Sequence, residues 1–321
     1  MALDFTSPQT LDEAVRLWHA APGSFWLAGG TDLVPEMKAT LKQPQRLVNL
    51  KDIESLRGIA ETEAGVRIGA LATLTEIAES DLVGTRYRAL AEACRAAASP
   101  QLRNVATLGG NLNQDSRCPY YRGAFPCWLK GGQVCFMREG ENREASIIGY
   151  HECVHVHPSD PPNALVALDA KIITRMNGDT RAIPAMGFFR APLEGDRRMN
   201  ALEPGEVVTE IQLPRFPNSQ STYEKAMDRA FWTFALVSAA VRVDLEGDRV
   251  SAARIVLGGV APVPWNAQEA EEGLKGQILS PESAAQASAT TLVGAQPLAH
   301  NGYKVQLARA LVKRSLLNLA R

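Results

Sequence analysis

Four of the five cysteines lie close together, at positions 118, 127, 135 and 153, and their thiols are the side chains best suited to chemistry. They are separated by 8, 7 and 17 residues, whereas Cys94 stands apart in a helical pattern. Four convergent sulfur ligands can bind zinc or an iron–sulfur cluster, and paired thiols can form disulfides. This spacing predicts either a sulfur-based site or four unrelated free thiols.

The spacing separates these alternatives in part. Structural zinc sites usually contain two cysteines only about two to four residues apart, and no gap here is that short. Disulfides suit small secreted domains, whereas this chain is long and has an odd number of cysteines. An iron–sulfur cluster imposes no fixed short spacing. From the residues alone, a cluster and unrelated free cysteines both remain open.

The last of these cysteines lies within HECVH at residues 151–155, which matches the HExxH pattern of zinc metalloproteases. That pattern needs a helix, on which both imidazoles share one face. Prolines follow at 158, 161 and 162, and no helical periodicity surrounds the motif. We therefore predict a loop with solvated histidines rather than a protease site.

Two glycine pairs suggest a different chemistry. AGGTDL at 28–33 follows a predicted strand, and ATLGGN at 106–111 precedes the cysteines. Glycine permits positive φ and close backbone approach, so such loops can direct N–H groups at a diphosphate, although many serve only as turns. Neither loop fits GxGxxG or GxxxxGK[ST], which argues against a Rossmann or P-loop site.

The elements that position these residues alternate between strands and helices in the first half of the chain. Thr10 and Glu13 form a capping box that predicts a helix from Leu11, and Asn177-Gly178 predicts a β-hairpin. Asn163 is expected to cap a short helix. Apolar patterns predict strands at 24–27, 46–50, 65–69, 171–175 and 180–183 and helices at 73–80 and 86–98.

Beyond about residue 185 the pattern changes to longer strands and then to helices. We predict strands at 206–213, 235–245 and 249–257, with the last two paired antiparallel. Helices are expected at 267–274, 281–292 and 303–320. This order indicates a second domain of antiparallel sheet with helices.

The composition is that of an ordinary folded protein: 321 residues, 45% hydrophobic and 21% charged, enough for about two domains. The 34 basic residues nearly balance the 35 acidic ones, so the net charge of the chain does not attract nucleic acid or anionic lipid. No uncharged apolar run reaches the roughly 18 residues of a membrane span, and the longest is 231–241. The first residues show no secretory pattern, so we expect a cytoplasmic protein or one exported with a partner.

Taken in order, six motifs resemble one family, the FAD-binding medium subunits of the molybdenum hydroxylases (the xanthine oxidase family). The motifs run through almost the whole chain: LAGGTDL at 27–33, IGALATL at 68–74, RNVATLGGN at 103–111, HPSD at 157–160, LGGVAP at 257–262 and NGYK at 301–304. One departure is PVPWN at 262–266, where many relatives have arginine after the tryptophan.

The resemblance implies an α+β fold. A vanillyl-alcohol-oxidase (PCMH)-type FAD-binding domain of two subdomains, 1–180, would contain the cysteine segment (residues 114–156). A C-terminal domain of the CO dehydrogenase flavoprotein type, 181–321, would follow. The glycine loops would hold the FAD diphosphate, the later PSD segment would lie near the ribose or adenine, and no catalytic acid or base is expected. The implied FAD-binding residues are Leu27, Ala28, Gly29, Gly30, Thr31, Asp32, Leu33, Ala70, Thr107, Gly109, Gly110, Asn111, Ser159 and Asp160.

The cysteine segment resembles an insertion found in a minority of this family, which carries a 4Fe-4S cluster. The resemblance implies that Cys118, Cys127, Cys135 and Cys153 are its ligands. The long last gap is similar to that of the bacterial three-subunit aldehyde oxidoreductases, typified by a periplasmic enzyme. The 4-hydroxybenzoyl-CoA reductases of the same minority place the long gap first.

The family also implies partners and an activity. A large subunit with a molybdenum cofactor would meet the substrate, and a small subunit with two 2Fe-2S clusters would pass electrons to FAD, in a heterotrimer or its dimer. We expect this chain to pass them to an external acceptor, in a complex that oxidises aldehydes to carboxylic acids. A CoA-thioester reductase and an N-heterocycle (xanthine-type) dehydrogenase are alternatives, and a zinc-stabilised assembly protein without flavin is one from another class. The periplasm is expected only if a signal-bearing partner exports the complex.

Overall fold

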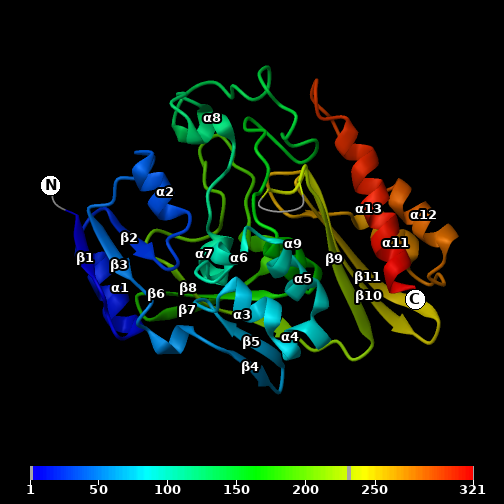
Figure 1. Ribbon diagram of the computed structural model, residues 1–321, viewed down its shortest axis with the longest axis horizontal. Coiled ribbons are helices and arrows are strands. Elements are labelled where there is room, and N and C mark those ends of the chain that lie inside the picture. Colours follow the sequence, from blue (N-terminus) through cyan, green and yellow to red (C-terminus); the bar gives the residue numbers. More distant parts are fainter. Residues whose placement is uncertain (1–2, 230–232, 321) are drawn as a thin grey trace.

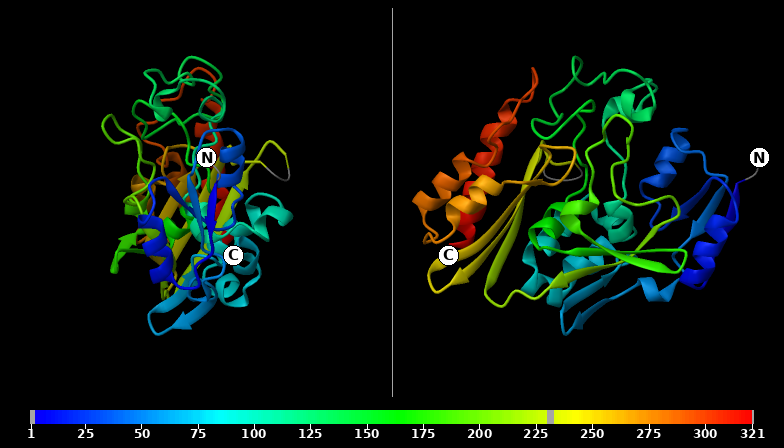
Figure 2. Two further views of the ribbon diagram at one scale, coloured as in Figure 1. Left: turned by 90° about the vertical axis from the view of Figure 1, so that its left-hand side faces the viewer. Right: turned by 180° about the vertical axis from the view of Figure 1, so that it is seen from behind.

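The computed structural model describes residues 3–229 and 233–320, and its strands form three sheets. Figure 1 shows them side by side along the long axis of the molecule, with the N-terminal sheet at one end and the C-terminal sheet at the other. The cysteine segment, drawn in green, lies above the middle of this row, and the rear view in Figure 2 shows the same arrangement. Within the described residues, no helix is both long and apolar enough to cross a membrane.

The N-terminal sheet is parallel, with the strand order β1-β3-β2. The Thr10 hydroxyl oxygen accepts a hydrogen bond from the Glu13 N–H at 3.2 Å, which confirms the predicted helix start. β2 ends at Leu27, so the first glycine loop leaves the end of a strand, as predicted. The elements are β1 (Asp4–Thr6), α1 (Leu11–His19), β2 (Ser24–Leu27), α2 (Leu33–Lys38) and β3 (Arg46–Asn49).

The middle sheet is antiparallel, with the order β4-β5-β8-β6-β7. Asn177 and Gly178 have φ values of 50° and 91°, as a two-residue type I′ hairpin requires, so the predicted hairpin is confirmed. The strands are β4 (Ile59–Thr62), β5 (Gly65–Gly69), β6 (Lys171–Met176), β7 (Asp179–Pro184) and β8 (Val207–Pro214). The helices that follow or pack near them are α3 (Leu74–Glu79), α4 (Asp81–Arg86), α5 (Arg88–Ala96), α6 (Pro100–Arg103), α7 (Leu108–Leu112), α9 (Pro161–Ala167) and α10 (Ala185–Phe188), with a 3-10 turn at Glu54–Leu56.

Two expectations for this region are corrected. The strand predicted at 206–213 is present as β8, but it pairs with β5 and β6 rather than with the later strands. Asn163 does not cap α9, because Asp160 occupies the N-cap and Asn163 lies inside the helix. Pro161 and Pro162 occupy the first turn, where a missing N–H costs nothing, and they fix the helix start upstream of Asn163.

The C-terminal sheet is antiparallel, with the order β12-β11-β10-β9, as predicted for this part of the chain. It is buried on both faces, because Ala240 and Val256 pack into the core of the middle sheet while Val241 and Ile255 pack under the C-terminal helices. The elements are β9 (Ser219–Ala226), β10 (Val237–Glu246), β11 (Arg249–Gly258), β12 (Trp265–Asn266), α11 (Gln268–Leu274), α12 (Pro281–Ala289) and α13 (Tyr303–Leu319).

The cysteine segment is mostly irregular, with only α8 (Pro119–Arg122) and a 3-10 turn (Trp128–Lys130). The start of α13 holds it in place. The fully buried Lys304 ammonium donates to the carbonyl oxygens of Glu144 at 2.8 Å, Ala145 at 3.0 Å and Gly259 at 2.7 Å. The Asn301 amide donates to the carbonyl of Ala145 at 3.1 Å. The NGYK motif therefore fastens the segment to the end of β11.

Candidate functional site

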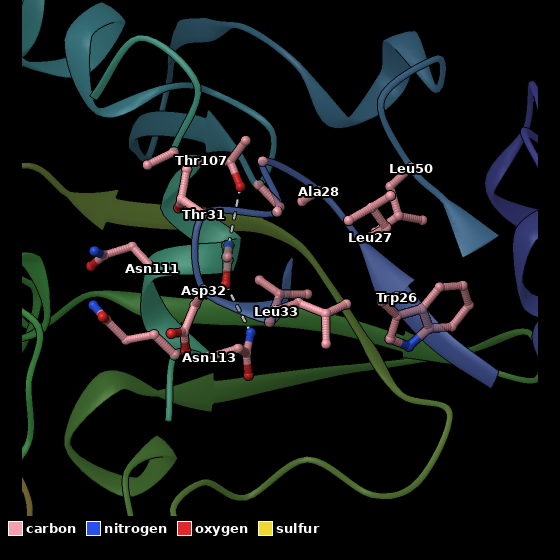
Figure 3. A pocket seen from close by; sticks show the side chains of 18 of the residues that line it. Trp26, Leu27, Ala28, Thr31, Asp32, Leu33, Leu50, Thr107, Asn111 and Asn113 are labelled. Carbon is pink, nitrogen blue, oxygen red and sulfur yellow. Dashed lines mark hydrogen bonds between the residues drawn. The ribbon is translucent and has the colours of Figure 1, made fainter. Parts of the chain in front are cut away.

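The two glycine loops form the walls of one cleft of about 300 Å³. All the predicted residues of 27–33, Ala70 and the predicted residues of 107–111 line it. In Figure 3, Thr31 and Asp32 of the first loop lie beside Asn111 of the second loop and Asn113, which follows that loop in the chain. The structure thus brings together two motifs that are about 75 residues apart in the sequence.

Close backbone contacts explain the glycines. A Cβ atom on Gly29 would lie 2.3 Å from the carbonyl oxygen of Val105, and one on Gly109 would lie 2.9 Å from the Ala70 Cβ. The Gly109 N–H donates to the Ala70 carbonyl at 2.8 Å, so Ala70 holds the second loop in place. Gly30 has a φ of 71°, which favours glycine. Each loop is thus shaped by steric limits that a larger residue would break.

The Asp32 carboxylate is paired with the cysteine segment. Its Oδ1 lies 2.8 Å from the Arg117 guanidinium and 2.9 Å from that of Arg122, and its Oδ2 accepts from the Asp115 N–H at 2.9 Å. The Glu36 carboxyl oxygen Oε1 lies 3.3 Å from the guanidinium of Arg122. Sequence reasoning missed these partners, because charged residues in an irregular segment carry no periodicity that shows which contacts they make.

The charge balance of this network leaves one carboxyl group neutral near pH 7. Burial, with the nearby carboxylates of Asp115 and Asp32, raises the pKa of Glu36 to about 8. A side-chain hydrogen bond joins Glu36 to Asp115. The cleft therefore places a protonated carboxyl group beside a cluster of ion pairs.

Ser159 and Asp160 lie in a neighbouring cavity of about 290 Å³ rather than in the cleft. Ser159 still links the two, because its hydroxyl donates to the Asn111 carbonyl at 2.7 Å. The buried Asp160 carboxylate pairs with the Lys225 ammonium at 2.8 Å. Arg117 lines both spaces, and its guanidinium lies 5.2 Å from the centre of the Phe234 ring in the cavity. Phe234 ends the sequence RAFWTF at 229–234, of which residues 230–232 lie outside the described part of the chain.

The four clustered cysteines are free thiols that influence one another. A hydrogen bond with Cys153 lowers the pKa of Cys135 to about 6, and the same bond raises the pKa of Cys153. Burial raises the pKa of Cys118 to about 11, and the charges of Cys135 and Cys127 add to this shift. Within residues 3–229 and 233–320, however, no group of three or more His, Cys, Asp or Glu side chains is arranged to hold a metal ion.

Backbone N–H groups are directed at these sulfur atoms. Hydrogen bonds from Tyr120 and Tyr121 act on Cys118, bonds from Met137 and Val154 act on Cys135, and one from His155 acts on Cys153. Such donors stabilise negative charge on sulfur, whether in a thiolate or in a metal-bound form. These backbone donors act to lower the pKa of the three thiols, whereas burial acts to raise it.

The HECVH segment is not helical, so the predicted loop is confirmed and its two imidazoles do not share a helical face. His151 is exposed, but the prediction of solvated histidines is wrong for His155, which is only 2% exposed. The Ser146 hydroxyl donates to the His155 carbonyl and the Ser146 N–H donates to the Val154 carbonyl at 2.8 Å, and these bonds hold His155 inside the cysteine segment.

Comparison with known proteins identifies the family. The model of the FAD binding domain in molybdopterin dehydrogenase matches residues 1–216, and that of the CO dehydrogenase flavoprotein C-terminal domain matches residues 221–319. The aldehyde oxidoreductase FAD-binding subunit PaoB of Escherichia coli K12 is 37% identical over 314 residues, covering 96% of this chain and 95% of PaoB. The carbon monoxide dehydrogenase medium chain of Hydrogenophaga pseudoflava is 28% identical over 319 residues, covering 98% and 95%.

Solved structures agree. The carbon monoxide dehydrogenase of Hydrogenophaga pseudoflava, in a form lacking the Mo-pyranopterin moiety of its cofactor, matches with a TM-score of 0.78 and 28% identity, covering 100% of this chain and 97% of that one. The predicted oxidoreductase family and the predicted mixed fold with an antiparallel C-terminal sheet are therefore confirmed. This chain belongs to the FAD-binding medium subunits of the molybdenum hydroxylase family.

Proposed function

We propose that the FAD of this subunit lies along the cleft between the two glycine loops and extends into the neighbouring cavity. The observation that carries this proposal is that both glycine loops line one cleft, where tight packing of Gly29 against Val105 and of Gly109 against Ala70 holds their backbones. Loops of this kind can bring backbone N–H groups close to a diphosphate. Each space is near the lower end of the roughly 300–1,000 Å³ of ligand sites, and Arg117 lines both.

In this proposal the residues of 27–33, Ala70 and 107–111 contact the flavin nucleotide in the cleft, and Ser159 and Asp160 contact it in the cavity. Bound there, FAD supplies a two-electron centre that can also release electrons singly. The protein contributes shape and charge. Because the Asp32 carboxylate already pairs with Arg117 and Arg122, its role is to hold the first loop in position.

The cysteine segment is proposed to bind a 4Fe-4S cluster through Cys118, Cys127, Cys135 and Cys153. Support comes from the influence of neighbouring thiols on the pKa values of Cys118, Cys135 and Cys153 and from the backbone N–H groups directed at these three. Residues 131–160 contain no helix or strand, so their backbone can rearrange without breaking regular structure. Such a rearrangement would bring the four cysteine sulfur atoms together. A cluster there would supply a one-electron centre beside the flavin site.

For the assembled complex we propose that aldehydes are oxidised to carboxylic acids. A partner subunit with the molybdenum cofactor and one with 2Fe-2S clusters would deliver the electrons, and an external acceptor would receive them from this chain. Support comes from the long last cysteine gap and from the identity with the aldehyde oxidoreductase subunit PaoB. The alternative activity, dehydrogenation of an N-heterocycle, is supported by lower sequence identities, such as 28% with the nicotinate dehydrogenase FAD-subunit of Eubacterium barkeri.

The test uses the complex purified with its own large and small subunits. Aromatic and aliphatic aldehydes, an N-heterocycle and a CoA thioester are each mixed anaerobically with it, and the redox change of the flavin absorbance is followed. We expect aldehydes to reduce the flavin fastest. The CoA thioester is also mixed with complex whose flavin has first been reduced with dithionite. Flavin reduction by the heterocycle alone, or reoxidation of the reduced flavin by the thioester with no response to aldehydes, would overturn the aldehyde assignment while leaving the FAD assignment intact.

A further inference from the structure

Arg117 lies where the cleft and the neighbouring cavity meet. Among the described residues that line these two spaces, it is the one that lines both. We infer that the Arg117 guanidinium is a binding residue for the diphosphate of FAD. This inference rests on the proposed function, because it requires FAD to extend from the cleft into the cavity.

The place of Arg117 matches the build of the cofactor, in which a diphosphate joins two ring systems. An FAD molecule with one ring system in each space has its diphosphate at the junction between them. The second glycine loop reaches the same junction, because its Asn111 carbonyl accepts a hydrogen bond from the Ser159 hydroxyl of the cavity at 2.7 Å. A glycine loop and a guanidinium therefore flank the passage between the two spaces.

The Arg117 guanidinium has donors that the protein does not use. Its Nη2 atom donates to the Gln114 side-chain oxygen at 3.1 Å and lies 2.8 Å from Asp32 Oδ1. Its Nε is buried without a hydrogen-bond partner, and no described residue accepts a hydrogen bond from its Nη1. The side chain is 30% exposed. Because guanidinium groups bind phosphate oxygens through several N–H donors at once, Arg117 can still bind one.

Arg122 approaches the same Asp32 oxygen, but its donors are already used. Its Nε donates to the Ser116 carbonyl at 2.7 Å and its Nη2 donates to the Asp115 carbonyl at 3.0 Å. Its Nη1 lies 3.3 Å from the carboxyl group of Glu36. Arg122 also lines the cavity but not the cleft. It therefore serves to hold the cysteine segment and provides a matched control.

The charges at the junction favour an anion. Arg117 and a second guanidinium face the single carboxylate of Asp32. The other basic residue that lines the cleft, Lys42, is paired with Asp115 at 2.9 Å. The nearby Glu36 is protonated near pH 7 and adds no charge. A positive charge thus remains in excess beside Arg117, and it attracts the negatively charged diphosphate.

The test compares two ligands that share the flavin ring but differ in phosphate. FAD and riboflavin are titrated into complex from which the flavin has been removed, and flavin fluorescence gives the dissociation constant of each. We expect Arg117→Met to weaken FAD binding about ten- to hundredfold, because hydrogen bonds to a charged group are lost, and to leave riboflavin binding unchanged. Arg117→Lys keeps the charge without the planar donor set and should fall between.

Arg122→Met is the control for a purely structural effect. It also removes one guanidinium from Asp32, so it should weaken both ligands by the same factor and leave their ratio unchanged. Phosphorus NMR of bound FAD gives a second readout. Arg117→Lys should shift the phosphorus signals, whereas Arg122→Lys should not, and these variants carry the test if the methionine variants do not assemble.

An equal loss of FAD and riboflavin affinity in Arg117→Met, or an unchanged affinity for FAD, overturns the inference and leaves the proposed flavin site standing. If riboflavin binds too weakly to titrate, the phosphorus signals decide, and unshifted signals in Arg117→Lys overturn the inference. Wild-type complex that binds no FAD overturns both the inference and the proposed function.

Discussion

The Asp32 carboxylate lies 2.8 Å from the guanidinium of Arg117, a pair that joins the first glycine loop to the beginning of the cysteine segment. Arg122 approaches the same oxygen at 2.9 Å. The proposed flavin cleft and the proposed cluster loop are thus held together by charge across more than 80 residues of sequence. Loss of this connection should affect both sites.

Asp32→Asn keeps the size of the side chain but removes the charge that two guanidinium groups share. We expect it to lower the free energy of unfolding by about 1–3 kcal/mol, because hydrogen bonds to charged groups in half-buried sites contribute that much. FAD and iron should both be lost more readily on dilution. Urea unfolding and cofactor assays measure these effects.

Asp196→Asn is the matched control. Asp196 also pairs with two arginines, Arg190 and Arg198, but its side chain is 37% exposed against 15% for Asp32. Solvent screens exposed pairs, so they contribute little to stability. Equal losses in the two variants would contradict a special role for Asp32.

Serine in place of any one of Cys118, Cys127, Cys135 or Cys153 should abolish or severely reduce the iron and acid-labile sulfide of the chain, because the hydroxyl is a poor ligand for the cluster. Inductively coupled plasma spectrometry and sulfide assay give the readout. Cys94→Ala is the control, since Cys94 is buried in the core and burial holds its thiol neutral. A serine variant that retains full iron and sulfide would remove that residue from the ligand set.

Lys304→Met should destabilise the attachment of the cysteine segment. The methionine keeps an apolar stem but leaves three carbonyl oxygens without their donor, two of them in buried hydrogen bonds, at a cost of about 3 kcal/mol. Limited proteolysis should then cut within 114–156 before the rest of the chain. Lys313→Met, on an exposed face of the same helix, should behave as wild type. Equal resistance to proteolysis in both variants would show that Lys304 does not hold the segment.

Glu36 gives the stability of the protein a defined pH dependence. The pKa of Glu36 is about 8 in the folded chain and near 4.5 when unfolded, so the folded state holds more protons between these values. The free energy of unfolding contributed by this group therefore falls as pH rises through that window. The measured quantity is the free energy of unfolding of Glu36→Gln minus that of wild type. This difference should be about 1–3 kcal/mol larger at pH 8.5 than at pH 5.

Urea unfolding at a series of pH values tests this prediction. The exposed Glu139→Gln serves as the control and should follow the wild-type profile. A constant difference between Glu36→Gln and wild type from pH 5 to pH 8.5 would show that Glu36 is ionised throughout.

Local chemistry made much of the fold predictable. The Thr10 cap, the hairpin turn at Asn177-Gly178 and the antiparallel strands β10 and β11 follow from patterns within a few residues, and the structure contains all three. The placement of β8 could not be predicted in this way. Its partners β5 and β6 are set by long-range packing, and an alternating strand pattern does not indicate which sheet the strand joins.

The candidate site was also predictable only in part. The glycine loops could be recognised in the sequence, because tight backbone contacts require glycine there. The pairing of Asp32 with Arg117 and the burial of His155 could not, because both depend on how the irregular cysteine segment folds. A charged residue in a loop can remain in solvent or pair anywhere on the surface, so its type alone does not reveal its partner. Spacing identified the cysteines, and only the three-dimensional arrangement revealed the donors around them.

A joint assay of flavin, iron and acid-labile sulfide, with an absorption spectrum, on anaerobically purified protein tests both cofactor assignments at once. We expect one FAD with about four irons and four sulfides per chain. Flavin without iron would contradict the cluster assignment. A colourless protein that contains zinc and no flavin would contradict the entire electron-transfer role.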